Sequence, residues 1–255
     1  MLLVAALAVI TVACSDSKEP ADDQPAPSAT GNGQATASLT GEQLEPLLTR
    51  AMLQPGDIPG TWKATDLGMS NGFAIAVLGG QQSQLAQAMI EGCLTPTLEG
   101  GGGTSAGDGT VRAMTADSVL GSVISMVTRT GDAEKAVQAL RQPVTDAMKA
   151  CVKSEVERVM GGAVPASAIS ITEMSAVSDL PDGSGANILA VTLGQGGSAI
   201  TQHMVTVGVA RDGLLSTVVE VTFGAGSTLP KPALAADRLV EATQKRLYEA
   251  LAAPR

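Results

Sequence analysis

Aromatic residues are scarce in this chain. They make up 2% of its 255 residues, and the full set is Trp62, Phe73, Phe223 and Tyr248. Sites that bind sugars or nucleic-acid bases by stacking need several aromatic rings on one surface. The composition therefore disfavours a stacking site.

Histidine, cysteine and positive charge are also in short supply. The chain has one histidine, His203, and three cysteines, none of which form a pair with zinc-ligand spacing. We therefore predict no metal site and no cofactor. The 16 Lys and Arg residues are outnumbered by 25 Asp and Glu residues, which gives a formal net charge of -9. Nucleic-acid binding needs a basic surface that displaces counterions, so we expect no nucleic-acid partner.

One sustained apolar run stands at the start of the chain. Residues 2–13 are apolar apart from Thr11, and the run stops at Cys14, after which the sequence turns polar. The run is shorter than the roughly twenty residues that cross a bilayer as a helix. Its length is typical of the apolar part of an export signal. Thr11, Val12 and Ala13 resemble the lipobox that precedes the lipidated cysteine of bacterial lipoproteins.

This segment predicts export followed by anchoring. We expect residues 1–13 to be a lipoprotein signal peptide and Cys14 to be the lipid attachment site, with acyl chains such as palmitate. Each buried methylene contributes about 0.8 kcal/mol, so these chains would hold the protein on the cell membrane, facing the extracellular side. No Lys or Arg precedes the run, which we interpret as a start codon assigned too late. The alternative is a buried N-terminal element followed by an ordinary cysteine.

The rest of the chain divides into a polar linker and a long folded part. Residues 14–39 are polar and rich in Pro and Gly, which is typical of a disordered tether. Residues 40–255 are long enough for a substantial core, and we predict a single domain. With Cys14 assigned to the anchor, Cys93 and Cys151 remain. Such a pair in an exported protein favours one disulfide, and the alternative is two separate buried thiols.

Hydrophobic periodicity predicts an α+β fold. Helices are expected at residues 40–53, 81–93, 132–160 and 232–251, and strands at residues 62–66, 72–78, 111–115, 119–129, 168–177, 187–194, 200–211 and 214–223. Thr40 and Gln43 have capping-box spacing, and Pro143 predicts a kink or a break in the third helix. Asp212-Gly213 predicts a two-residue hairpin turn. The last four strands would form an antiparallel meander, covered by helices.

Four short patterns invite a chemical interpretation, but each has a simpler one. Residues 68–72 match G-x-S-x-G, with Ser70 as a nucleophile and His203 as its base. The strand–turn–helix context that this motif requires is weak, so we interpret the motif as a turn and predict no catalytic residue and no enzymatic activity. His203 is expected to be a partly exposed strand residue. The glycines of residues 194–197 lack the Lys and the helix of a phosphate loop. Asp179 and Asp182 are better explained by turn formation than by cation binding.

Several segments together carry a family resemblance. They are the lipobox cysteine, the linker, "LLTRAMLQPGDIPGTWKAT", "GSVISMVTRTGDAEKAVQALRQPVTDAMKAC" and the terminal meander with its helix. In this layout the chain resembles a family of actinobacterial lipoproteins that is similar to the extracellular sensor domains of actinobacterial Ser/Thr protein kinases. The resemblance implies a central antiparallel sheet with packed helices, a cleft for a small or lipid ligand, and disulfides that pin the helices.

Two classes of function remain open. The first is a surface lipoprotein whose domain binds an unidentified small molecule, lipid or protein partner without catalysis. The second is a lipid or glycolipid carrier with an apolar cavity. The chain is rich in Ala, Val and Leu and has 10 Met residues, a composition that suits an adaptable cavity and an ordinary core equally well.

Overall fold

The computed structural model describes residue 36 and residues 39–68, 109–116, 121–159, 165–195, 198–226 and 231–253. These residues belong to one compact unit, which spans Gly31–Arg255. Cys14, Ser70 and Cys93 lie outside the described residues, as do the predicted strand at 72–78 and the predicted helix at 81–93. The described part of the chain confirms the α+β class.

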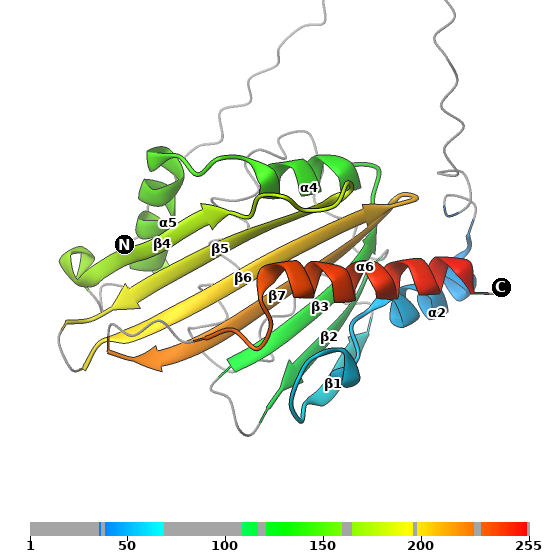
Figure 1. Ribbon diagram of the computed structural model, residues 1–255, viewed down its shortest axis with the longest axis horizontal. Coiled ribbons are helices and arrows are strands. Elements are labelled where there is room, and N and C mark those ends of the chain that lie inside the picture. The colour runs from blue at the N-terminus through cyan, green and yellow to red at the C-terminus, as the bar shows by residue number, and fades with distance from the viewer. Residues whose placement is uncertain are drawn as a thin grey trace, which may run out of the picture. The chain divides into compact units, whose positions relative to one another are not determined.

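Seven antiparallel strands form one sheet (Figure 1). The strands are β1 (Lys63–Gly68), β2 (Gly109–Thr115), β3 (Gly121–Arg129), β4 (Ile169–Ala176), β5 (Ser184–Leu193), β6 (Ile200–Arg211) and β7 (Leu214–Ala225). Their order across the sheet is β1-β2-β3-β7-β6-β5-β4. The predicted meander of four strands is present as β4 to β7, and β3 pairs with β7 to add three more strands.

The turn between β6 and β7 fixes the register of the two longest strands. Asp212 has a φ of 50° and Gly213 a φ of 75°, as a type I′ turn requires. This confirms the predicted hairpin. With this turn, His203 pairs with Thr222 and Val205 pairs with Glu220.

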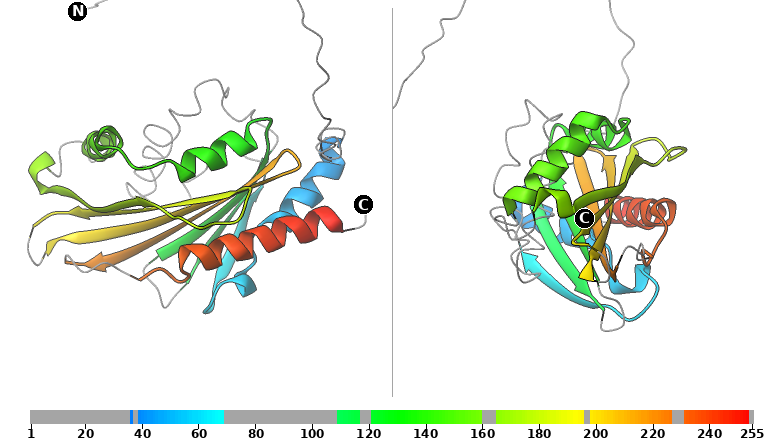
Figure 2. Two further views of the ribbon diagram at one scale, coloured as in Figure 1. Left: turned by 45° about the horizontal axis from the view of Figure 1, so that its top comes forward. Right: turned by 90° about the vertical axis from the view of Figure 1, so that its left-hand side faces the viewer.

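Helices cover both faces of the sheet (Figure 2). They are α2 (Gly41–Ala51), α4 (Ala133–Arg141), α5 (Asp146–Val159) and α6 (Ala236–Ala252), with short 3-10 turns η1 (Pro55–Asp57) and η5 (Ala166–Ala168). The face covered by α2 and α6, here named the α6 face, packs Val205, Val207 and Val218 against Leu239 and Leu247. On the opposite face, Val152 and Val156 of α5 pack against Leu189 and Met204.

The predicted helix boundaries hold at two of three places. The capping box of α2 is present, because Gln43 Oε1 accepts the Thr40 backbone N–H at 3.3 Å. The chain breaks between α4 and α5 around Pro143, as its missing N–H predicts. The last helix, however, begins at Ala236 rather than near residue 232.

Residues before α2 already belong to the fold. Thr36 donates its hydroxyl to the Asp212 carbonyl, and Arg129 donates to the Leu39 carbonyl at 2.9 Å. Thr36 is 1% exposed. Thr36 and Leu39, which precede α2, therefore contact the described part of the domain.

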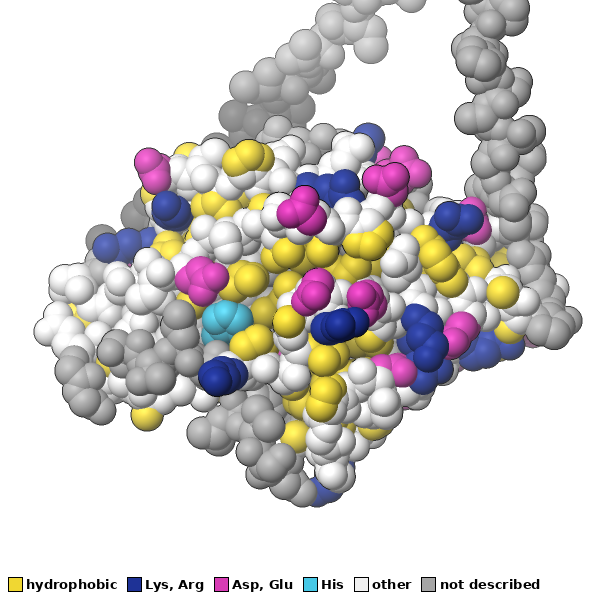
Figure 3. Space-filling view, in the orientation of Figure 1, with side chains coloured by type: hydrophobic (Ala, Val, Ile, Leu, Met, Phe, Trp, Pro, Cys, Tyr) yellow, Lys and Arg dark blue, Asp and Glu magenta, His cyan; other side chains and the backbone are white. Residues whose placement is uncertain are grey.

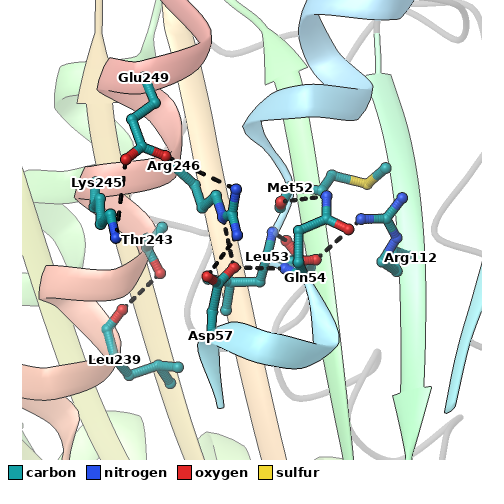
Figure 4. Close-up of polar contacts among 11 residues, drawn as sticks. Met52, Leu53, Gln54, Asp57, Arg112, Leu239, Thr243, Lys245, Arg246 and Glu249 are labelled. Atoms are coloured by element: carbon teal, nitrogen blue, oxygen red, sulfur yellow. Dashed lines mark hydrogen bonds and ion pairs between the residues drawn. The ribbon is translucent and has the colours of Figure 1, made fainter. Parts of the chain in front are cut away.

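An ion pair joins α6 to the turn after α2 (Figure 4). Arg246 donates from Nε to Asp57 Oδ2 at 2.6 Å and from Nη2 to Asp57 Oδ1 at 2.7 Å. Asp57 Oδ2 also accepts the backbone N–H of Gln54 at 2.7 Å. The hydrogen bonds to Asp57 raise the pKa of Arg246. Both oxygens of this carboxylate are thus committed to holding the helix in place.

A second bidentate pair ties β1 to β2. Arg112 is 6% exposed and donates through Nε and Nη2 to the two carboxylate oxygens of Asp66. Its Nη1 donates to the Leu53 carbonyl at 3.1 Å. The hydrogen bond from Arg112 is the main cause that lowers the pKa of Asp66. These charged groups are fully paired and have a structural role.

Candidate functional site

Six described side chains of β6 and β7 are buried and carry a polar atom without a hydrogen-bond partner, and three of them are considered first. His203 is 6% exposed, Glu220 1% and Thr222 2%. Within the described structure, His203 Nδ1, Glu220 Oε2 and Thr222 Oγ1 have no hydrogen-bond partner. We call these three residues the polar cluster. An unpaired buried polar group costs about 1–3 kcal/mol, so each one needs an explanation.

The strand register brings the polar cluster together. His203 lies directly opposite Thr222, and Glu220 is two residues before Thr222 on β7. Because side chains alternate between the two faces of a strand, all three lie on the same face as Val205 and Val218, which is the α6 face. Figure 3 shows the single histidine, in cyan, on this face with an acidic side chain next to it.

Small residues flank the polar cluster on both sides. Ala190 of β5 lies opposite His203, and Glu173 of β4 lies opposite Ala190. On the other side, Gly121 of β3 lies opposite Thr222. The partly buried carboxylate of Glu173 acts electrostatically on the imidazole across Ala190. No side chain larger than a methyl group therefore lies directly beside His203 on β5 or beside Thr222 on β3, whereas Glu220 lies between Val205 and Val123.

Glu220 also has a structural role at the start of α6. Its carboxylate accepts the backbone N–H groups of Ala233 and Leu234, which lie just before the helix. These bonds hold residues 231–235 in a non-helical path and explain why α6 begins at Ala236. They also place a carboxylate near the positive end of the helix dipole. Oε2 is the oxygen of Glu220 that lacks a partner.

Burial shifts both titratable groups of the polar cluster toward their uncharged forms. Burial lowers the pKa of His203, and the negative charge of Glu173 offsets part of that effect. Burial raises the pKa of Glu220, and the N–H groups of Ala233 and Leu234 offset part of that effect. An imidazole, a hydroxyl and a carboxyl group at this place can hydrogen-bond a polar ligand and exchange a proton with it.

Other unpartnered buried atoms do not form a comparable group. They belong to Thr128, Asn187, Gln202, Thr206 and Ser216. Among these, Asn187 and Thr206 lie opposite each other on the face that α4 and α5 cover. None of the five is ionisable at neutral pH. The polar cluster is therefore the stronger candidate in the described part of the chain.

The structure answers only part of the sequence-based site predictions. Cys14 and Cys93 lie outside the described residues, so lipid attachment and the disulfide stay predictions. Cys151 lies on α5, as expected for the second piece of the broken helix, and packs with the core on that face. Ser70 also lies outside the described residues, so the hydrolase alternative is untested. Asp179 has a φ of 58°, which fits the predicted turn.

The prediction that His203 is partly exposed is wrong. Its exposed fraction is 6%, because β6 lies in the interior of the sheet between β5 and β7. The sequence prediction also missed Glu220, Thr222 and Glu173. The hairpin turn was predicted correctly, and it already places His203 opposite Thr222. A lone Glu in the apolar run of β7 was the available signal for Glu220.

Neither metal binding nor a membrane span is evident in the described residues. They contain no group of three or more His, Cys, Asp or Glu side chains that could hold a metal ion. Among the described helices, none is both long and apolar enough to cross a bilayer.

Comparisons with known proteins provide little guidance. No family model and no curated protein matches the chain. One solved structure, a Pseudomonas aeruginosa protein of unknown function suggested to be a regulator, is 11% identical with a TM-score of 0.18. The match covers 56% of this chain and 90% of that one. So low a TM-score carries no argument about fold or function.

Proposed function

We propose that this chain is a membrane-anchored surface lipoprotein whose α+β domain is a non-enzymatic binding module, with its ligand at the polar cluster. The main observation in support is that His203, Glu220 and Thr222 are each at least nine-tenths buried, and each has one polar atom without a hydrogen-bond partner. A bound polar group would supply the missing hydrogen bonds and offset the cost of burial. The resemblance to extracellular sensor domains is consistent with this class of function.

The single histidine makes the proposal directly testable. Since the chain has one histidine, its imidazole NMR signals report on His203 alone. The full chain, purified in detergent, is titrated with a library of small polar fragments that are positively charged, neutral or negatively charged. We expect at least one fragment to shift the imidazole signals in a saturable way. If no fragment of any charge does so, the polar cluster is not a ligand site.

Two matched variants separate binding from folding. Thr222→Val removes one hydroxyl of the polar cluster and keeps the side-chain shape. Thr206→Val makes the same change on the opposite face of the sheet, where Thr206 is 3% exposed and also has an unpartnered Oγ1. We expect Thr222→Val to weaken fragment binding and Thr206→Val to leave it unchanged. Equal weakening in both variants would point to a general effect on the fold.

The anchoring part of the proposal has its own test. Replacing Cys14 with Ser should move the protein from the membrane fraction to the soluble fraction, because the acyl chains would have no attachment site. Mass spectrometry of the mature N-terminal peptide should show lipid on Cys14. An unlipidated peptide that still contains residues 7–13 would contradict the assignment.

The lipid-carrier alternative remains a prediction without a specific observation in its favour among the described residues. Co-purified lipid in native mass spectra would favour it over the binding module proposed here.

A further inference from the structure

The carboxylates of Glu220 and Glu173, at and beside the polar cluster, differ from those of Asp57 and Asp66 in having no cationic partner among the described residues. Asp57 and Asp66 are each held by a bidentate arginine. Neither Glu220 nor Glu173 forms an ion pair with any residue that the structure describes. Arg211 and Lys231 are the basic residues nearest to Glu220 along the chain, and both are exposed. The site therefore contains acceptor capacity and negative charge that the described part of the fold does not balance.

An anionic ligand does not fit this charge pattern. The N-terminal end of α6, which attracts anions in many proteins, is already occupied by the carboxylate of Glu220. A second anion would lie near Glu220 and Glu173 and would lack a positively charged imidazole, because burial keeps His203 in its neutral form. Like charges repel more strongly in a buried site than in water.

The unpartnered atoms instead match the donors of a primary ammonium group. Such a group has three N–H donors and no acceptor. Glu220 Oε2 and Thr222 Oγ1 are acceptors on one face of the sheet. His203 Nδ1, on the same face, is a third acceptor when the neutral imidazole carries its proton on Nε2. A quaternary ammonium lacks the donors, and a neutral hydroxyl compound leaves the carboxylates without a counter-charge. Resting on the proposed function, we infer that the polar cluster binds the primary ammonium group of a small amine.

Three probes that differ in one terminal group test this inference. Ethanolamine, ethylene glycol and glycolate share a hydroxymethyl group and end in an ammonium, a hydroxyl and a carboxylate. Each is titrated into the full chain at mildly alkaline pH, with the imidazole signals of His203 as the readout. We expect saturable shifts with ethanolamine alone. Lowering the pH should weaken binding, since protonated Glu220 must release its proton to pair with the ammonium.

Variants of the two carboxylates sharpen the result. Glu220→Gln keeps an oxygen acceptor but removes the charge, and it should weaken ethanolamine binding by about tenfold or more. Glu173→Gln should weaken it less, because Glu173 lies two strands away from His203. Thr206→Val, on the opposite face, serves as the control with unchanged affinity.

The outcomes separate this inference from the proposed function. Ethylene glycol or glycolate binding as tightly as ethanolamine would overturn the ammonium assignment and leave the binding module in place, as would unchanged affinity in Glu220→Gln. If none of the three probes binds, the ammonium assignment fails. If, in addition, no fragment of the library shifts the His203 signals, the proposal that the polar cluster is a ligand site fails as well. Nα-acetyl-lysine amide distinguishes the source: tighter binding than ethanolamine identifies a lysine side chain rather than a free amine, and both results support the ammonium chemistry.

Discussion

Glu220 combines a hydrogen-bonding role with a buried charge, and the two respond differently to substitution. Glu220→Gln retains an acceptor for the N–H groups of Ala233 and Leu234, whereas Glu220→Ala removes it. We expect Glu220→Ala to be less stable than Glu220→Gln by about 1–3 kcal/mol of unfolding free energy at every pH, because neither variant side chain titrates. The measurement is urea unfolding over a range of pH values.

The same pair of variants predicts a pH dependence with a definite sign. Because burial raises the pKa of Glu220 above the ordinary value of 4.5, its protonated form is favoured in the folded state. The wild-type chain is therefore destabilised relative to Glu220→Gln as the pH rises from that value through the folded pKa. We expect Glu220→Gln to be at least as stable as wild type at neutral pH and the difference to vanish in acid. A constant difference across this range would contradict a raised pKa.

His203 should titrate below the ordinary histidine range. Burial lowers its pKa from 6.5, so protonation in the unfolded chain draws the protein toward unfolding as the pH falls below that value. An NMR titration of the single imidazole should give a midpoint below 6.5. Replacing Glu173 with Gln should lower the midpoint further, because the carboxylate favours the imidazolium form. A midpoint at or above 6.5 in the wild-type chain would refute the lowered pKa.

At the scale of elements, α4 sits close to the sheet because two glycines make room for it. A Cβ on Gly185 would lie 2.5 Å from the backbone oxygen of Val137, whereas a Cβ on Gly208 would lie 2.7 Å from Cδ1 of Leu140. A backbone atom in a helix cannot move without the helix, but the end of a leucine side chain can rotate away. We expect Gly185→Ala to cost about 1–3 kcal/mol and Gly208→Ala to cost clearly less. Chemical denaturation of both variants measures the contrast, and equal costs would show that α4 itself moves.

The attachment of α6 depends on one ion pair more than on the others. The Asp57 side chain is 11% exposed and that of Arg246 is 29% exposed, and two short hydrogen bonds join them. A double-mutant cycle with Asp57→Ala and Arg246→Ala should give a coupling energy of about 1–2 kcal/mol. The matched control is Arg238 and Glu241 on the same helix, whose side chains are 66% and 58% exposed. This exposed pair should show no measurable coupling, since water screens it. Similar coupling in both pairs would refute a special role for Asp57.

For the whole molecule, the predicted disulfide between Cys93 and Cys151 is the main open covalent feature. In the chain-entropy model, a loop of this length stabilises the fold by about 4 kcal/mol. We therefore expect reduction to lower the unfolding temperature clearly. Mass spectrometry after alkylation of the unfolded chain in denaturant, without reductant, should find both residues protected, because unfolding exposes buried thiols but leaves a disulfide intact. Alkylation of both under these conditions would contradict the pairing and favour separate buried thiols.

The sequence alone determined the local structure of the described part. Alternating apolar residues identified β2 to β7, the missing N–H of Pro143 separated α4 from α5, and Asp212-Gly213 specified the hairpin. These features depend on residues that are close in the chain, so periodicity and turn chemistry are enough to predict them.

Only the tertiary structure decided how those elements bury one another. Pairing of β3 with β7 extended the meander to seven strands, and the interior position of β6 buried His203. Glu220 is separated in sequence from Ala233 and Leu234. In the fold it accepts their backbone N–H groups, just before α6, and so helps set where that helix begins. The hairpin turn predicts that His203 lies opposite Thr222, but the burial of the polar cluster could not be predicted. Burial and desolvation depend on contacts between segments that are distant in the sequence, which no local pattern of residues encodes.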